Sequence, residues 1–152
     1  MKILIRKATK KDLSQVRTFQ GQLDKARQKL WKKSRAFHDR TKPSRLITKI
    51  SARGILLVAE NDHQLVGFVY GEISKRPNHK LAKLGDVEEL FVLADFRQRG
   101  VSIKLMKALI KEFKKKGCDH IITHTDSENE PAQALYKTIG MAPVTVELWK
   151  KI

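Results

Sequence analysis

Residues 88–106 read EELFVLADFRQRGVSIKLM, and this stretch decides the fold. Its first part, through Leu93, is rich in strand-forming residues. From Gly100 onward apolar residues recur at helical spacing, at Ile103, Met106, Leu109, Ile110 and Phe113. A helix that follows a strand so closely presents its unpaired first amides and a partial positive charge to solvent. Gly100 lacks a Cβ that would obstruct a ligand, and Arg97 and Arg99 add charge, so the junction is suited to bind a pyrophosphate; the alternative is an ordinary solvated turn.

The rest of the chain supplies strands and helices in a mixed order around this junction. Residues 55–73 predict an antiparallel hairpin that turns at Asn61-Asp62-His63. Residues 86–93, 100–116 and 120–125 then predict a strand, a helix and a strand. An early hairpin combined with later β-α-β units indicates the α/β (α+β) class, with a mixed central sheet and helices packed against it.

The two ends of the chain complete this order. A strand at residues 3–5 is followed by a capping-box spacing from Thr9 to Asp12 and by a helical apolar stripe that reaches at least Leu30. We expect a loop over residues 32–43 and a shorter helix that starts at Ser44 and ends before Gly54. Residues 75–83 predict another loop, residues 129–139 a last helix, and residues 143–149 a last strand.

Length and composition limit the class of protein. The 152 residues predict one domain over residues 1–152, and 41% hydrophobic with 32% charged residues is typical of a folded chain. No apolar run approaches the about 20 residues of a membrane-spanning helix, and the first ten residues do not form a signal peptide, so a cytoplasmic location is expected. With Cys118 as the one cysteine and no histidine pair at a zinc-protease spacing, we expect no metal site.

Two sequence blocks resemble the GNAT superfamily of N-acetyltransferases. Arg97-x-x-Gly100-x-Ser102 is similar to the family's acetyl-CoA motif Q/R-x-x-G-x-G/A, although Ser102 departs at the last position. Residues 129–141, NEPAQALYKTIGM, are similar to the family's N-x-x-A-x-x-L-Y-x-x-x-G-F, with Met141 in place of Phe. The resemblance covers nearly the whole chain. It implies a mostly antiparallel sheet with helices on both faces and splayed middle strands.

The resemblance also implies where acetyl-CoA, the expected co-substrate, would bind. The strand at residues 86–93 would part from the strand at residues 120–125, and the pantetheine arm would lie between them. Backbone groups of the first strand would meet pantetheine and the thioester, at Leu90, Phe91 and Val92. The cofactor phosphates would be held by the loop and helix start, at Arg97, Gln98, Arg99, Gly100, Val101, Ser102 and Ile103. Asn129 would hydrogen-bond the cofactor arm, and Tyr136 would lie near the sulfur.

Three residues are candidates for catalysis by direct attack of a primary amine on the thioester. By resemblance Tyr136 would return a proton to the thiolate; the alternative is a tyrosine that only packs on the sheet. Glu88 and His124 are candidate bases, with a solvent-facing or salt-bridged side chain, or water acting alone, as the alternatives. Strict alternation along a strand predicts that Glu88 and Glu89 face opposite sides and that Glu88 shares a face with Asp86.

The charge distribution bears on the acceptor and on partners. The net charge is +16, and residues 1–50 hold 16 basic but only 3 acidic side chains. Resemblance places the acceptor over the first two helices and the loop between them, and this region holds Lys25, Arg27, Lys29, Lys32, Lys33, Arg35, Arg40, Lys42 and Arg45. Polyamines and aminoglycosides are therefore disfavoured relative to an amine that also carries a carboxylate or phosphate, or an acidic protein N-terminus. A solubilising basic surface explains the charge equally well. The alternatives are a nucleic-acid- or ribosome-associated binding module, which is not favoured, and a non-catalytic acetyl-CoA sensor; a homodimer is expected by analogy alone.

Overall fold

A computed structural model describes residues 2–33, 47–75, 83–146 and 148 of the chain. Within these residues five strands form one sheet in the order β1-β2-β3-β4-β5, with bounds Ile3–Lys7, Gly54–Asn61, Gln64–Lys75, Lys83–Val92 and His120–Thr123. The first four strands pair antiparallel, and β5 pairs parallel to β4. The α-helices are α1 (Leu13–Lys33), α2 (Val101–Lys115) and α3 (Glu130–Thr138). The mixed, mostly antiparallel sheet predicted from the sequence is confirmed.

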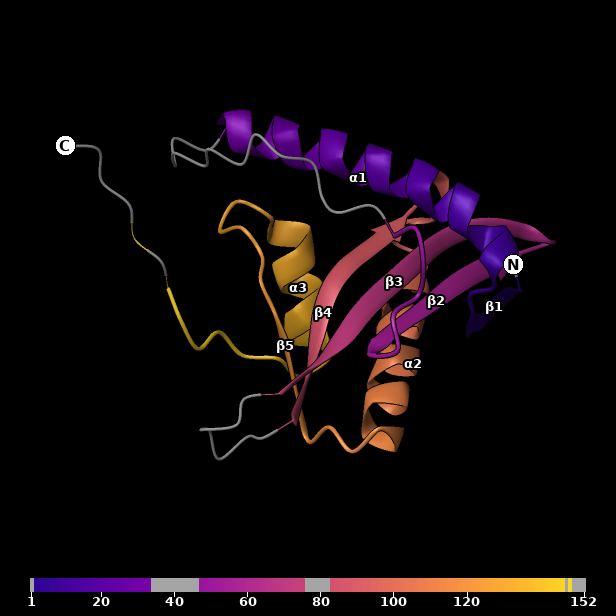
Figure 1. Cartoon of the computed structure of the whole chain (residues 1–152). Coiled ribbons are helices and arrows are strands. Elements are labelled where there is room, and N and C mark those ends of the chain that lie inside the picture. The colour runs from indigo at the N-terminus through magenta and orange to yellow at the C-terminus, as the bar shows by residue number, and fades with distance from the viewer. Residues whose placement is uncertain (1, 34–46, 76–82, 147, 149–152) are drawn as a thin grey trace.

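The sheet is covered on both faces, as the sequence predicted. Figure 1 shows α1 along one face and α2 on the opposite one. On the α1 face, Phe19 packs with Phe68 of β3 and Phe91 of β4, with ring centroids 6.4 and 5.1 Å from that of Phe19. On the other face, apolar residues of α2 and α3 belong to the same hydrophobic cluster as the alternate residues of β2, β3 and β4 that face away from α1. Away from irregularities in pairing, alternation along a strand therefore assigns each residue to the α1 face or to the α2 face.

The start of α1 is tied to the sheet by Asp12. Its carboxylate accepts hydrogen bonds from the amide of Thr9 at 2.7 Å and from the Thr9 hydroxyl at 3.0 Å, as the capping-box spacing predicted. The Arg6 guanidinium of β1 also donates to both Asp12 oxygens, at 2.8 and 3.0 Å. This arrangement lowers the pKa of Asp12 to about 2, first through the hydrogen bonds from Arg6. A short 3-10 turn, Lys10–Asp12, leads into the helix.

A bulge in β4 changes the direction of its side chains. Tyr70 pairs with Glu89 while the next residue, Gly71, pairs with Val87, so Glu88 is an extra residue opposite β3. Before the bulge Val87 packs on the α2 face; after it Glu89 contacts Gln20 of α1. The pairing of β4 with β5 ends at the same place, because the last pair is Val87 with Thr123. The parting of the two middle strands that the resemblance implied is thus present, and it begins at Glu88.

Most predicted elements are confirmed within a few residues of their bounds, and two are not. Residues 47–50 form no helix, although a helix was predicted to run through them from Ser44; residues 34–46 lie outside the described part. The predicted last strand is absent over residues 143–146, and Val144 is 93% exposed because no neighbouring strand pairs with it there. The helix α1 extends to Lys33 where a loop was expected from residue 32. In the described residues, no helix has the length and apolar character needed to cross a membrane.

Candidate active site

The start of α2 presents backbone amides in the way the sequence predicted. The amide of Lys104 donates to the Gly100 carbonyl at 3.1 Å, and it is the first in α2 with an acceptor one turn earlier. The three preceding amides, of Val101, Ser102 and Ile103, point out of the helix start. Gly100 takes the left-handed conformation, with φ 76° and ψ 6°, and a Cβ placed on it would project into open space. The turn therefore offers several donors and no side chain that blocks them, which suits a phosphate.

Arg97 holds the loop before α2 onto the end of β4. Its Nε donates to the Val92 carbonyl at 2.9 Å, and its guanidinium lies over the Phe91 ring, 6.0 Å from the centroid. The side chain that the sequence assigned to phosphate binding thus has a positioning role in this structure. Gln98, with a φ of 57°, completes the tight turn that brings Gly100 beside the strand end.

The free edge of β4 carries the groups needed beside a thioester. The Leu93 amide donates to Val66 of β3 at 2.9 Å. Because backbone groups alternate in direction along a strand, the amides of Val92 and Leu90 point away from β3, toward the side on which β5 lies. β5 has already ended its pairing at Thr123, whose hydroxyl donates to the Val87 carbonyl at 3.0 Å. Two backbone N–H groups of β4 therefore face the region where the strands part.

Glu88 and His124 lie at the point where the strands part. Each is the residue directly after the last β4–β5 pair, and the two interact electrostatically. The pKa of Glu88 is raised above its ordinary value, first because the surrounding protein partly desolvates the carboxylate and then because Asp86, Glu72 and Glu89 add negative charge. A carboxylate with a raised pKa is a stronger base at neutral pH. The two base candidates from the sequence are thus brought together in one place.

The strict alternation assumed for Glu88 and Glu89 does not hold in β4, because the bulge makes Glu88 an extra residue opposite β3. Glu89 is buried against α1, where its carboxylate accepts a hydrogen bond from Gln20 Nε2 at 2.8 Å. Glu88 raises the pKa of Tyr70, whose ring belongs to the core on the α1 face. Glu88 is close enough to Tyr70 and Glu72 to interact with them electrostatically, and an extra residue in a strand suspends the alternation that the sequence argument assumed.

Sequence reasoning missed the side chains that interact electrostatically with Glu88. Glu72 pairs with Asp86 across β3 and β4, and the Tyr70 hydroxyl donates a hydrogen bond to Glu72 Oε1. Desolvation and this hydrogen bond raise the pKa of Tyr70 to about 12. The sequence could have placed Phe68, Tyr70 and Glu72 on one face of β3 by alternation. It could not have shown that Tyr70 and Glu72 lie near Glu88, because that depends on how β3 pairs with β4. Among the described residues, no group of three or more His, Cys, Asp or Glu side chains is arranged so that it could hold a metal ion.

The residues from the second sequence block lie on the opposite face. Tyr136 of α3 is half-buried and packs against the hydrophobic cluster on the α2 face. Asn129 caps α3 by accepting a hydrogen bond from the Ala132 amide at 3.3 Å. That bond gives Asn129 a structural role, and its contact with a cofactor arm stays a prediction.

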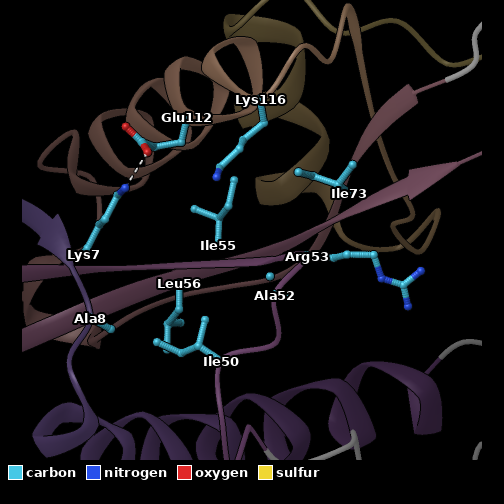
Figure 2. A pocket seen from close by; sticks show the side chains of 11 residues that line it. Lys7, Ala8, Ile50, Ala52, Arg53, Ile55, Leu56, Ile73, Glu112 and Lys116 are labelled. Carbon is cyan, nitrogen blue, oxygen red and sulfur yellow. Dashed lines mark ion pairs between the residues drawn. The ribbon is translucent and has the colours of Figure 1, made fainter.

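Figure 2 shows a separate hollow, of about 160 Å³, at the start of β2. Lys7, Arg53 and Lys116 line it together with apolar side chains, and Lys7 is paired with Glu112 at 3.0 Å. None of the site residues predicted from the sequence lines it. The candidate site is therefore the strand opening and the start of α2, since the amides and the catalytic candidates converge there.

Comparison with known proteins agrees with this geometry. The model of the Acetyltransferase (GNAT) family matches residues 23–141. Mycothiol acetyltransferase of Renibacterium salmoninarum is 30% identical over 91 residues, which make up 60% of this chain and 27% of that protein. N-alpha-acetyltransferase 30 of Schizosaccharomyces pombe is 29% identical over 84 residues, 55% of this chain and 54% of that protein. The chain thus spans between about a quarter and about half of the length of these relatives.

A solved structure shows the same fold over the full length. It is AAC(6')-Iy in complex with the bisubstrate analogue CoA-S-monomethyl-acetylneamine, with a TM-score of 0.74 and 23% sequence identity. The similarity covers 100% of this chain and 99% of that one.

Proposed function

We propose that this chain, which belongs to the acetyltransferase (GNAT) family, transfers the acetyl group of acetyl-CoA to a primary amine. The carrying observation is the combination of an open helix start at Gly100 with strands that part directly beside it. The open helix start suits a diphosphate, and the parting strands expose backbone donors beside the place proposed for the pantetheine arm. The two named relatives are a mycothiol acetyltransferase and an N-alpha-acetyltransferase. Their names support an acyltransferase and do not identify the acceptor of this chain.

The residues present fit acetyl-CoA. Backbone amides from Gln98 to Ile103 would hold the diphosphate, and the outward amides of Leu90 and Val92 would meet the pantetheine arm and the thioester oxygen. Bound acetyl-CoA would supply an activated acetyl group. The AAC(6')-Iy structure, which contains a CoA conjugate, supports this choice of co-substrate.

Glu88 is proposed to activate the amine. Its carboxylate, alone or through water, would accept a proton from the acceptor nitrogen, with His124 as the neighbouring alternative. The nitrogen would form the new C–N bond as the C–S bond breaks. The outward N–H of Val92 would stabilise the negative charge that develops on the thioester oxygen.

Tyr136 is proposed to complete the proton balance. It packs on the α2 face of the sheet, and its place in the second sequence block, which resembles the family motif, supports this role. Its hydroxyl would give a proton to the departing thiolate. In a Tyr136→Phe variant we expect turnover to fall by about ten- to a hundred-fold while CoA affinity stays within about two-fold.

The deciding experiment combines CoA binding by calorimetry with thiol release from acetyl-CoA over a panel of amines. We expect saturable binding and amine-dependent thiol release. In the parent enzyme, activity should fall at acidic pH as Glu88 is protonated, at a pH above the ordinary carboxylate range because the pKa of Glu88 is raised. In Glu88→Gln this acid limb of the pH profile should disappear together with most of the activity. Retention of that limb in Glu88→Gln would assign the base to His124 or to water. Binding without thiol release from any amine would instead support the sensor that the sequence left open.

A further inference from the structure

We infer that Glu89 positions the base of the reaction: its carboxylate, held by α1, fixes the bulge of β4 so that Glu88 lies where β4 and β5 part. This inference rests on the proposed function, because the place of Glu88 matters for turnover only if Glu88 accepts the proton of the amine. Glu89 is not proposed to touch the substrate. It acts through its neighbour and is therefore a positioning residue.

The carboxylate of Glu89 has a polar group of α1 beside each of its oxygens. Gln20 Nε2 donates a hydrogen bond to Glu89 Oε2 at 2.8 Å, and a guanidinium nitrogen of Arg27 lies 3.9 Å from Glu89 Oε1. Gln20 and Arg27 are seven residues apart in α1, so about two turns of helix bring both side chains to one face. The helix therefore holds this carboxylate at two points.

Burial makes the bond between Gln20 and Glu89 costly to break. Gln20 is 0% exposed and Glu89 is 8% exposed. Gln20 Oε1 also accepts a hydrogen bond from the amide of Ile47 at 2.9 Å, so the side-chain amide of Gln20 is fixed at both of its ends. A buried polar or charged group that loses its partner keeps the cost of leaving water without a bond in return. Glu89 is therefore held against α1, and β4 is held with it.

Glu89 and Val87 together determine where the bulge lies. Val87 belongs to the cluster on the α2 face, whereas Glu89 contacts α1 on the other face. Residues two positions apart in a regular strand share one face, so an irregularity has to lie between these two. Glu88 is the residue between them, and the pairing with β3 shows it as the extra one. The place of Glu88 thus follows from the contacts of its two neighbours.

The same bulge sets the backbone donors relative to Glu88. Beyond it Phe91 packs on Phe19 at the α1 face, while Leu90 and Val92 belong to the α2 face. Without the extra residue, every side chain from Glu89 onward would change face, and the amides of β4 that point away from β3 would change too. By fixing the bulge, Glu89 aligns the base with the outward amide of Val92.

Two conservative variants separate the reach of Glu89 from its charge. Glu89→Gln keeps the length of the side chain and an oxygen that accepts from Gln20, but it carries no charge. Glu89→Asp keeps the charge but is shorter by one methylene, about 1.5 Å, so it reaches Gln20 only if β4 shifts. The measured quantity is kcat for thiol release, with acetyl-CoA and amine saturating and at the pH of maximal activity.

We expect kcat to stay within about three-fold of the parent in Glu89→Gln and to fall by at least about ten-fold in Glu89→Asp. The reason is that a displacement of about 1 Å in a catalytic group can cost about a hundred-fold in rate. A larger loss in Glu89→Gln than in Glu89→Asp would show that charge and not reach matters, and it would overturn the inference.

A double-mutant cycle tests whether Glu89 acts through Glu88. In a Glu88→Gln background, adding Glu89→Asp should lower kcat by less than about two-fold, because the group that Glu89 positions is already missing. If the two losses instead multiply, Glu89 acts in another way and the inference fails, while the proposed acetyl transfer stands. Parental kcat in Glu88→Gln would also overturn the inference, since no base would be there to position. Absence of thiol release with every amine in the parent would overturn both.

Asp12→Asn controls for a general loss of stability. It breaks another polar link between α1 and the sheet, the bonds from Arg6 of β1, and β2 and β3 separate that strand from β4. We expect Asp12→Asn to be less stable than the parent in urea and to keep kcat within about two-fold. Calorimetric titration with CoA verifies that each variant is folded. A loss of kcat in Asp12→Asn as large as in Glu89→Asp would attribute the effect to destabilisation and contradict the inference.

Discussion

The helix start at Gly100 is best tested by adding a single methyl group. Gly100 has a φ of 76°, and the position of an added Cβ has no protein atom within 4 Å. Gly100→Ala therefore introduces backbone strain of about 1–2 kcal/mol but no clash inside the protein. The methyl group projects where the diphosphate would approach the amides. Loss of one hydrogen bond to a charged phosphate costs about 1.5–3 kcal/mol, so we expect CoA affinity to fall at least about ten-fold.

Gly117, at the other end of the same helix, provides the matched control. Its φ is 80°, and its added Cβ would have one ordinary contact, 3.7 Å from Lys83 Nζ. Gly117→Ala should therefore lower the free energy of unfolding by a similar amount and leave CoA affinity unchanged. Urea unfolding measures the first quantity and isothermal titration with CoA the second. Equal CoA affinity in the two variants would refute the assignment of the α2 start as the diphosphate site.

Three further predictions concern the framework around the site. Asp12→Asn should lower the free energy of unfolding by about 2 kcal/mol at pH 7. Because the pKa of Asp12 is lowered to about 2, this difference between the two proteins is present above about pH 4 and is lost as the pH falls through 2. Urea unfolding of both proteins across this pH range measures it. Gly85→Ala would place a Cβ 2.4 Å from the Phe113 ring and should destabilise the fold by about 1–3 kcal/mol, measured by thermal unfolding, whereas an unchanged Tm would contradict the packing described. Gln20→Leu removes the 2.8 Å donor to Glu89 and the acceptor of the Ile47 amide, at 2.9 Å, and should cost about 2–4 kcal/mol; a loss below 1 kcal/mol in urea unfolding would show that this bridge between α1 and β4 contributes little.

Local patterns were sufficient to predict much of the fold. The helical spacing of apolar residues from Ile103 to Phe113 was sufficient to locate α2. Gly100 was sufficient to locate the open start of that helix, since both signals depend on residues close in the chain. The capping contact of Asp12 was predicted for the same reason. The predicted strand over residues 143–149 is absent from residues 143–146, because alternation creates a strand only where a neighbouring edge is available.

The candidate site was predictable in its parts but not in its arrangement. The roles of Glu88, His124 and Tyr136 came from resemblance; the structure brings Glu88 and His124 together where β4 and β5 part, and the role of Tyr136 stays a prediction. The assignment of Arg97 to phosphate did not anticipate its bond to the Val92 carbonyl, since that contact depends on how the loop folds back.

The sequence by itself determined the open helix start that is proposed to hold the diphosphate, because helix periodicity and the conformational freedom of Gly100 are properties of a short stretch of chain. The tertiary structure alone brought the acidic residues near Glu88 together. Glu72 and Asp86 are 14 positions apart in the sequence and meet only because β3 and β4 pair in one register, and Glu88 joins them only because of a bulge. Register and bulges depend on the contacts between strands, and a pattern read along one strand does not contain them.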